Sequence, residues 1–286
     1  MSFRGLLIAF VLITPGLQGD DQQRIETLLA DKYVGKVLTL RGFYKQGSLD
    51  YDSAGEPKSK RESGPWTLYG RLEVTRMKVK RGKLEIEGNR LWVEWVLGPK
   101  GERKMQLVRT TDSVFLRADL RQPEPDEFEI DNVLKRIFVN SKDRMSDLVP
   151  EHWRRFFGGT GGPTADVSES KPQSDGPIAV QDETRATNKP QSTQLFQVSE
   201  GRLMKRVVPA YPEPAKRARL QGAVVLDAVI DKQGRISDLS VSQPLGLGTE
   251  EASVDAVKQW IYKPYLLNGQ PVEVETKITL NYQLTP

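Results

Sequence analysis

The sequence contains no cysteine and only one histidine, His152. Without cysteine, the chain cannot form a disulfide, a thiol nucleophile or a Cys-ligated metal site. With one histidine, it has almost no material for Ser-His-Asp or Cys-His catalysis, in which a base stands beside the nucleophile. No segment has the spacing of a calcium-binding loop. We therefore expect no metal, no cofactor and no enzymatic activity. A hydrolase that uses two carboxylates in the first half of the chain is the weaker alternative.

A strong excess of charge of one sign is also missing. The 42 Lys and Arg residues stand against 38 Asp and Glu residues, so the net charge is only +4. A nucleic-acid-binding protein concentrates its basic residues on one element, whereas here the two signs are interspersed. The densest basic stretch, residues 76–83, is typical of a solvated hairpin tip that could at most touch an anionic surface. We expect no nucleic-acid partner.

No apolar run reaches the roughly 20 residues that a transmembrane helix needs. Arg4 precedes a short apolar stretch over residues 5–14, and residues 15–19 then end in a small residue, Gly19. This order is typical of a cleavable secretory signal. We predict that residues 1–19 are a signal peptide and that the mature protein is periplasmic. The alternative is an N-terminal segment that is retained as an inner-membrane anchor, with the rest of the chain facing the periplasm.

Residues 20–157 are predicted to form a β-rich domain. Apolar and polar side chains alternate with a period of two in three segments, residues 37–41, 84–88 and 91–95. This period marks strands with one buried face. Turn-forming residues separate the segments, at 52–55, 81–82 and 98–101. The pattern indicates an antiparallel meander or small barrel of about four to six strands.

Three further features belong to this domain. Apolar residues from Phe128 to Phe138 recur at helical spacing behind acidic residues, which predicts a helix. Apolar residues between Leu148 and Phe157 are expected to close the core. Trp92 and Trp95 point to opposite faces of one strand. We therefore expect one of them in the core and the other exposed, where it could contact a partner.

Residues 158–202 are predicted to be a flexible linker. Gly, Ser, Thr, Pro, Gln and charged residues dominate it, and large apolar side chains almost vanish. Such a segment cannot bury enough surface to offset the entropy lost on ordering. We expect proteases to cut it first and to leave two stable domains, residues 20–157 and 203–286.

Residues 203–286 have the pattern of a small ββαβ module. Its expected elements are an extended segment over 208–212, a short helix over 213–220, strands over 224–230 and 236–241, a helix from the cap Thr249 to Trp260, and final strands around an Asn-Gly turn. The predicted fold class is α+β, with a β-rich N-terminal domain, a flexible linker and this C-terminal module.

An ordered series of short motifs in this module resembles the TonB C-terminal domain family. The members are Tyr211-Pro212, Ala215 to Ala218, Gln221-Gly222, Asp231 to Ile236 with Gly234, Val257 to Trp260, Tyr262 to Pro264, and Asn268-Gly269 followed by Gln270 to Val272. No single piece is specific, but the whole series in order is. Most of these residues are expected to have structural roles, as turns, stiff segments or core anchors.

The resemblance implies that function lies at an unpaired edge of the sheet. In that family the last long strand accepts an extended peptide, the TonB box of an outer-membrane receptor, by strand addition. Here the corresponding strand carries Val274, Glu275, Thr276, Lys277, Ile278, Thr279 and Leu280. The expected partner is such a peptide or another envelope protein. The alternative is an edge that Glu275 and Lys277 only protect against aggregation.

The chain departs from the energy-transducing members of that family in three ways. Those members carry a histidine in a transmembrane anchor, a stiff Pro-rich spacer and a Gln before Pro-x-Tyr-Pro. Here the only histidine is His152, the linker is polar, and Val208 takes the place of the Gln. We predict a TonB-family envelope interaction protein. The alternative is a true energy transducer for outer-membrane transport that works with an inner-membrane motor complex.

Overall fold

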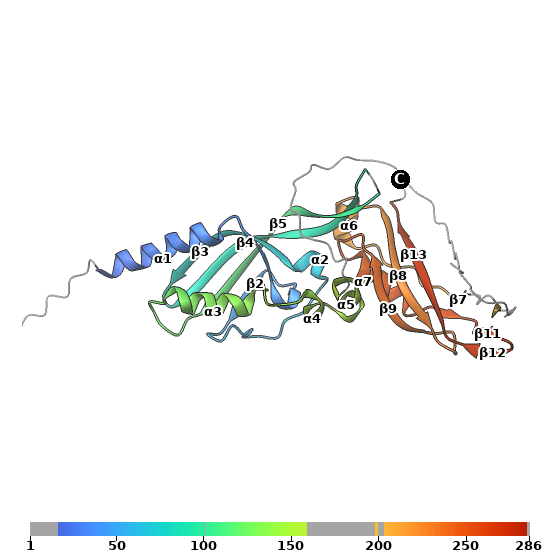
Figure 1. Cartoon of the computed structure of the whole chain (residues 1–286). Coiled ribbons are helices and arrows are strands. Elements are labelled where there is room, and N and C mark those ends of the chain that lie inside the picture. Colours follow the sequence, from blue (N-terminus) through green and yellow to red (C-terminus); the bar gives the residue numbers. More distant parts are fainter. Residues whose placement is uncertain (1–16, 100, 159–197, 200–202, 285–286) are drawn as a thin grey trace, which may run out of the picture.

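The structure, a computed structural model, describes residues 17–99, 101–158, 198–199 and 203–284 (Figure 1). Residues 1–16 of the predicted signal peptide and most of the predicted linker lie outside the described residues. Gly19, the expected cleavage position, falls in the first described helix, α1 (Leu17–Tyr33). None of the helices in the described ranges is both long and apolar enough to cross a lipid bilayer.

The N-terminal region, residues 17–158, is built on a five-stranded sheet with the order β1-β3-β4-β5-β2. Its strands are β1 (Val37–Thr39), β2 (Ser48–Tyr51), β3 (Arg71–Lys80), β4 (Lys83–Leu97) and β5 (Arg103–Asp119). Its helices after α1 are η1 (Arg41–Phe43), α2 (Trp66–Tyr69), α3 (Glu127–Ile137), α4 (Met145–Leu148) and α5 (Glu151–Gly158). The β-rich, mixed α+β character predicted for this part of the chain is confirmed.

The expectation of a purely antiparallel meander is wrong at β2. Neighbouring pairs from β1 to β5 are antiparallel, but β2 lies at the opposite edge from β1 and pairs in parallel with β5. The chain makes this arrangement by crossing from β2, through α2, to β3 on the other side of the sheet. A period of two in the sequence predicts which residues share a face, but it does not predict strand order.

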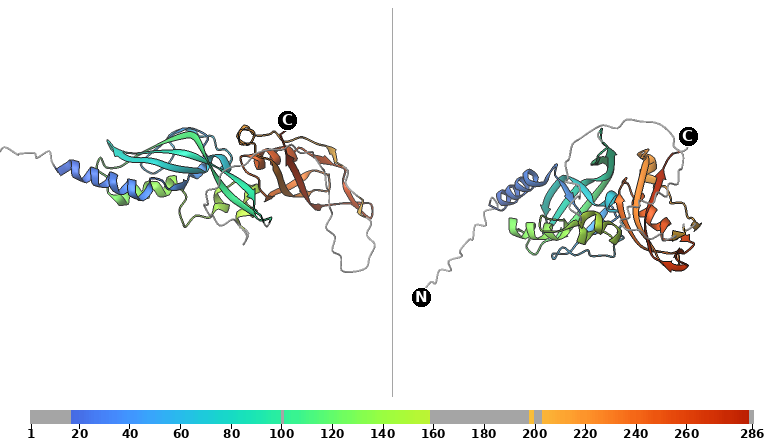
Figure 2. Two further views of the ribbon diagram at one scale, coloured as in Figure 1. Left: turned by 90° about the horizontal axis from the view of Figure 1, so that it is seen from above. Right: turned by 45° about the vertical axis from the view of Figure 1, so that its right-hand side comes forward.

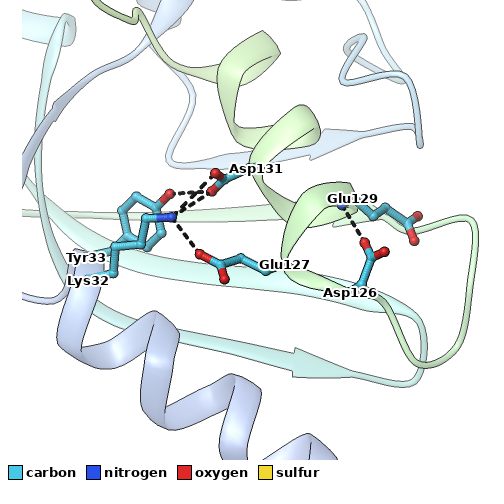
Figure 3. Close-up of polar contacts among 6 residues, drawn as sticks. All are labelled: Lys32, Tyr33, Asp126, Glu127, Glu129 and Asp131. Carbon is cyan, nitrogen blue, oxygen red and sulfur yellow. Dashed lines mark hydrogen bonds and ion pairs between the residues drawn. The ribbon is translucent and has the colours of Figure 1, made fainter.

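Helices α1 and α3 pack on the same core. Leu29 of α1 and Ile130 of α3 are fully buried in one apolar cluster with Leu84 and Ile86 of β4. Polar contacts join the two helices at the surface (Figure 3). Lys32 Nζ lies 3.0 Å from Glu127 Oε1 and 3.1 Å from Asp131 Oδ1, and the hydroxyl of Tyr33 donates to Asp131 Oδ1 at 2.9 Å.

Helix α3 confirms the predicted helix but not all of its predicted apolar face. Asp126 is the N-cap, and its side chain accepts a hydrogen bond from the backbone N–H of Glu129 at 2.7 Å (Figure 3). Phe128, expected in the apolar stripe, is 73% exposed. It precedes the buried Ile130 by two residues, about 200° around a helix, so it points away from the sheet.

The C-terminal module, residues 203–284, has a three-stranded antiparallel sheet with the order β13-β8-β9. Its elements are β7 (Leu203–Lys205), α6 (Glu213–Arg217), β8 (Gly222–Ile230), β9 (Ile236–Gln243), α7 (Thr249–Val257), β10 (Ile261–Tyr262), β11 (Tyr265–Leu267), β12 (Gln270–Val272) and β13 (Val274–Tyr282). A two-residue strand, β6 (Val198–Ser199), pairs with β11. The predicted strand–turn–strand, helix and final strand are therefore present.

Two local predictions for this module need correction. The first helix ends at Arg217 and not at residue 220, because Arg219 has a positive φ of 50° that a helix cannot contain. The N-cap of α7 is Gly248 and not Thr249. Thr249 is fully buried in the first turn, and its hydroxyl donates to the carbonyl of Gly246 at 2.7 Å.

A second apolar core joins the N-terminal region to the C-terminal module. Trp66, Trp92, Trp95 and Trp153 belong to it together with the residues that fill the C-terminal sheet. Both Trp92 and Trp95 are buried, with 9% and 4% of their surface exposed, so the expectation that one of them is exposed is wrong. The reason is that this part of β4 is covered on both sides, on one of them by the C-terminal module. The guanidinium of Arg217, for example, lies 5.2 Å from the Trp92 ring centroid.

Candidate peptide-binding edge

Strand β13, which carries the predicted site residues Val274 to Leu280, lies at one edge of the C-terminal sheet. It pairs along its whole length with β8, from Val274 opposite Ile230 to Tyr282 opposite Gly222. No strand within the described ranges pairs with its other side. In Figure 1, β9 is the strand nearest the N-terminal region and β13 is the one farthest from it.

The hydrogen bonds of β8 establish which backbone groups of β13 face outward. The backbone N–H of Asp231 donates to Arg235, and the carbonyls of Val229 and Val225 accept from serine hydroxyls of β9. Odd-numbered residues of β8 therefore face β9, and even-numbered residues face β13. Since even residues of β8 stand opposite even residues of β13, the odd residues of β13 turn their N–H and C=O groups to the open edge.

The outward residues in the predicted site are Glu275, Lys277 and Thr279. All three side chains are exposed. Ile278 and Leu280, whose backbone groups point toward β8, have buried side chains in the core. Lys277 Nζ lies 2.6 Å from Asp227 Oδ1 on the neighbouring strand. The edge thus offers a row of backbone donors and acceptors, flanked by a mixed set of polar and charged side chains.

The aromatic residues and prolines of the family-like motif hold the module together and do not line this edge. The Tyr211 hydroxyl donates to the carbonyl of Leu220, and its ring packs edge-on against Tyr282, with centroids 5.3 Å apart. Trp260 is 5% exposed, and its indole N–H donates to the carbonyl of Val207 at 2.8 Å. Pro212 precedes α6 as its N-cap, and Pro264 is half-buried.

The remaining motif residues serve turns and close approaches. Gly234 has a φ of 78°, and a Cβ there would overlap the carbonyl oxygen of Tyr262. A Cβ on Gly222 would lie 2.8 Å from the side-chain methyl Cδ1 of Leu245. Asn268 and Gly269, with φ of 52° and 79°, form the turn between β11 and β12. Gln221 is half-buried, and its side-chain oxygen has no hydrogen-bond partner within the described residues.

The opposite edge of the sheet is covered by the N-terminal region. Helix α5 packs against β9, and Arg155 donates to Ser240 Oγ and Asp238 Oδ2, both at 2.9 Å. From the same helix the indole N–H of Trp153 donates to Glu251 Oε1 at 2.9 Å. Trp153 itself is fully buried, and its ring lies 5.3 Å from that of Trp66, edge to face.

A buried loop beyond β9 completes this contact. Residues 244–248, which we call the docking loop, pair with β4 through the backbone: Trp95 N–H donates to Leu245 O at 3.0 Å, and Leu247 N–H donates to Val93 O at 3.1 Å. Gly246 and Leu247 have φ of 108° and 54°. A Cβ on Gly246 would overlap the backbone of β4, so a glycine is needed for this approach.

Glu250 of α7 holds the docking loop through two hydrogen bonds. It is 0% exposed, and its Oε1 accepts the N–H groups of Leu245 and Gly246, both at 2.6 Å. Its Oε2 is buried without a hydrogen-bond partner among the described residues. Burial, followed by the negative charge of Glu251, raises the pKa of the Glu250 carboxyl well above its ordinary value.

The contact between the two regions is the main feature that sequence reasoning missed. The apolar residues between Leu148 and Phe157 are expected to close the core of a separate domain, whereas Trp153 lies in a core shared with the C-terminal sheet. One signal was available. Four of the five tryptophans stand in residues 66–153, a large apolar supply for a region whose strands otherwise alternate with charged residues.

Comparison with known proteins identifies the C-terminal module. Residues 207–284 match the family model described as the Gram-negative bacterial TonB protein C-terminal. Protein TonB of Vibrio cholerae serotype O1 is 29% identical over 80 residues, which cover 28% of this chain and 33% of that protein. Protein TonB of Xanthomonas campestris pv. campestris is 30% identical over 77 residues, or 27% of this chain and 34% of that protein.

The family-model match begins at residue 207 and does not include the N-terminal region. The chain spans about a third of the length of these curated relatives, and the matched part is the module that carries β13. The ordered motif of residues 211–272 lies within the matched residues. Residues 207–284 are a domain of the TonB C-terminal family.

Proposed function

We propose that this chain is a cell-envelope interaction protein whose β13 edge binds an extended peptide by strand addition. The observation that carries the proposal is the asymmetry of the C-terminal sheet. The side at β9 is occupied by the chain's own N-terminal region, whereas no described strand pairs with the outer side of β13, whose odd-numbered residues direct their backbone groups outward. The favoured partner is a peptide of an outer-membrane receptor, and another envelope protein is the second choice.

The chemistry of the edge suits binding more than catalysis. The outward residues Glu275, Lys277 and Thr279 supply alternating N–H and C=O groups, so a peptide strand would gain main-chain hydrogen bonds. Their side chains carry both charge signs and a hydroxyl, which gives limited sequence preference. Affinity should therefore depend on the backbone of β13, and the exposed side chains should only tune it.

Energy transduction is the second candidate, favoured by the relatives' name, Protein TonB. That role would require the apolar segment near the N-terminus to be retained in the inner membrane, where a motor complex could act on it. Intact-mass analysis of the protein isolated from an envelope fraction decides this point. A mass that lacks residues 1–19 favours the periplasmic interaction protein, and the full mass favours the transducer.

The strand-addition proposal is tested with proline at an outward N–H. Lys277→Pro removes a donor that faces the open edge, and Lys277→Ala is the control for the lost side chain. Ile278→Pro removes an N–H that bonds β8 and should unfold the sheet. The ligand is a synthetic peptide that carries the TonB box of an outer-membrane receptor, and binding is measured by calorimetry beside circular dichroism of each variant.

We expect Lys277→Pro to stay folded and to bind at least about tenfold more weakly, since a lost hydrogen bond and a blocked ladder act together. Lys277→Ala should bind within about threefold of the parent. If a folded Lys277→Pro variant binds the peptide as tightly as the parent, strand addition at β13 is excluded. The open edge would then have another role.

A further inference from the structure

The end of the molecule farthest from α1 carries a patch of exposed cations and apolar side chains. β7 lies at this end, with β11 and β12, in Figure 1. The patch, which we call the cationic patch, consists of Met204, Lys205, Arg206, Val208, Arg235, Lys258, Ile261 and Lys263, all of them exposed. Its apolar members are unusually open to solvent: Val208 is 77% exposed, Met204 67% and Ile261 40%.

Backbone pairing brings Lys205, Arg235 and Ile261 together from distant parts of the sequence. Ile261 of β10 stands opposite Lys205 of β7 on one side and forms a bridge with Arg235 on the other. Side chains directly opposite in antiparallel strands lie on the same face, so a lysine and an arginine flank the exposed isoleucine. Lys263 follows two residues later on the same chain segment.

Trp260 fixes one border of the patch. Its indole N–H holds the carbonyl of Val207, and the guanidinium of Arg206 lies 5.7 Å from its ring centroid. Arg206 and Val208 are therefore presented on a rigid base, although they stand in a segment outside the main sheet. The positions of these side chains do not depend on the ladder of β7 alone.

The charge of the patch is not neutralised by its surroundings. None of its five cations, Lys205, Arg206, Arg235, Lys258 and Lys263, forms an ion pair with the part of the chain that the structure describes. Asp255 is the exposed acid nearest in sequence, one helical turn before Lys258. The carboxylate of Asp231 is engaged by the N–H groups of Gln233 and Arg235.

We propose that the cationic patch binds the surface of an anionic lipid bilayer. Cations attract phosphate headgroups, while apolar side chains beside them enter the boundary of the acyl region. Long Lys and Arg side chains can keep their charges in the headgroup layer while their stems follow the apolar contact. An acidic peptide fits less well, because β7 offers an edge of only three residues, too short for a strand-adding ligand.

The site would place the module on a membrane with the start of β13 close to the lipid. Arg235 follows the turn after β8, and Ile230 at the end of β8 pairs with Val274. This inference does not rest on peptide binding at β13. It would nevertheless bring that edge close to proteins embedded in the same bilayer.

The test uses the full chain from residue 20 and two kinds of vesicle, phosphatidylcholine alone and phosphatidylcholine mixed with an equal part of phosphatidylglycerol. Binding is measured by co-flotation at several salt concentrations. The variant carries Lys205→Glu, Arg235→Glu and Lys263→Glu together. The matched control carries Lys60→Glu, Lys80→Glu and Lys142→Glu, which change the net charge equally on exposed sites of the N-terminal region.

We expect the parent to float with the anionic vesicles only and to lose binding as salt rises. The patch variant should bind at least about tenfold more weakly and the control within about twofold of the parent. Ile261→Ser with Val208→Ser should weaken binding without changing its salt dependence. Circular dichroism confirms that each variant is folded, and the β13 peptide should bind all of them alike.

The proposal fails if the parent does not bind anionic vesicles, or if the patch and control variants lose binding equally. It also fails if the parent ignores vesicles but binds a soluble acidic peptide through the same three cations. A loss of peptide binding at β13 with intact vesicle binding would instead count only against the proposed function.

Discussion

The two sides of the C-terminal sheet differ in what covers them. At β9, residues Leu239, Ser240 and Val241 are all buried in succession, because α5 lies against one side and the module's own core against the other. At β13 buried and exposed residues alternate from Lys277 to Leu280. A family module that has two edges as an isolated sheet is thus reduced to one open edge by the domain that precedes it.

This difference suggests that the N-terminal region stabilises the module and restricts where partners can bind. The contact combines a tryptophan cluster, backbone pairing with the docking loop and hydrogen bonds from Arg155. Four predictions test the comparison, from the covered side, where effects should be large, to the open edge, where a side chain should matter little.

The largest effect is expected for Trp153→Ala at the covered side. This side chain is fully buried between the two regions and donates to Glu251. Its truncation should lower the free energy of unfolding by about 3–5 kcal/mol, measured by urea denaturation. Phe128→Ala, which changes an aromatic side chain that is 73% exposed, is the control and should stay within about 0.5 kcal/mol of the parent. Equal effects would mean that the two regions do not share a core.

Gly246→Ala should damage the docking loop next. Gly246 has a φ of 108°, and a methyl group there would overlap the backbone of β4. Strain and overlap together should cost about 3 kcal/mol. Gly269→Ala is the control, since its φ is 79° but no atom lies within 4 Å of the added carbon, so only about 1 kcal/mol is expected. Thermal unfolding of both variants would show whether overlap with the backbone of β4 lowers stability beyond the effect of backbone strain alone.

Glu250→Gln should change how stability depends on pH. Burial and Glu251 raise the pKa of Glu250 from 4.5 to about 7 in the folded protein. The folded state therefore holds a proton that the unfolded chain releases, so this residue's contribution to stability falls as pH rises from about 4.5 to 7. The parent should lose about 2–3 kcal/mol over this window relative to the variant.

The measurement for Glu250 is the difference between the two curves of unfolding free energy against pH. Other groups, such as Asp143, whose pKa is lowered by Arg41, titrate alike in both proteins and cancel in the difference. Parallel curves from pH 4.5 to 7 would show that burial and Glu251 do not raise the pKa of the Glu250 carboxyl in the folded protein.

The smallest effect is expected for Lys277→Ala on the open edge. The ion pair of Lys277 with Asp227 is largely exposed, with 69% of the lysine side chain accessible. Exposed pairs contribute little, so stability should change by less than about 0.5 kcal/mol. Urea denaturation checks this value. A loss of more than about 1 kcal/mol in the free energy of unfolding would show that the Lys277–Asp227 ion pair contributes substantially to the stability of this edge.

Local features of the fold could be predicted well from the sequence. The alternation of β8 and the turn at Gly234 are confirmed, and so are the helix α3 behind its acidic residues and the buried position of Trp260, expected as a core anchor. Each depends on neighbours within a few residues or on a strong apolar preference. The helix α1, by contrast, was not foreseen, because its buried side chains are too few to produce a clear helical period.

The candidate site was predicted in part. The sequence placed the proposed binding strand at Val274 to Leu280, but it did not determine which of its N–H groups face outward, since that depends on the hydrogen bonds of β8 with β9. It also did not predict the role of the docking loop or of Glu250. The docking loop pairs with the distant strand β4, and Glu250 holds that loop, so no local pattern in the sequence reports either role.

The sequence by itself determined the two building blocks, a β-rich region and a TonB C-terminal module, because periodicity and turn chemistry are local properties of the chain. The tertiary structure alone decided that these blocks share a tryptophan core and that one side of the C-terminal sheet is covered while no described strand pairs with the outer side of β13. The physical reason is that burial of apolar surface has no direction. The sequence shows where the tryptophans stand, but only packing shows that Trp66, Trp92, Trp95 and Trp153 are all buried and against what.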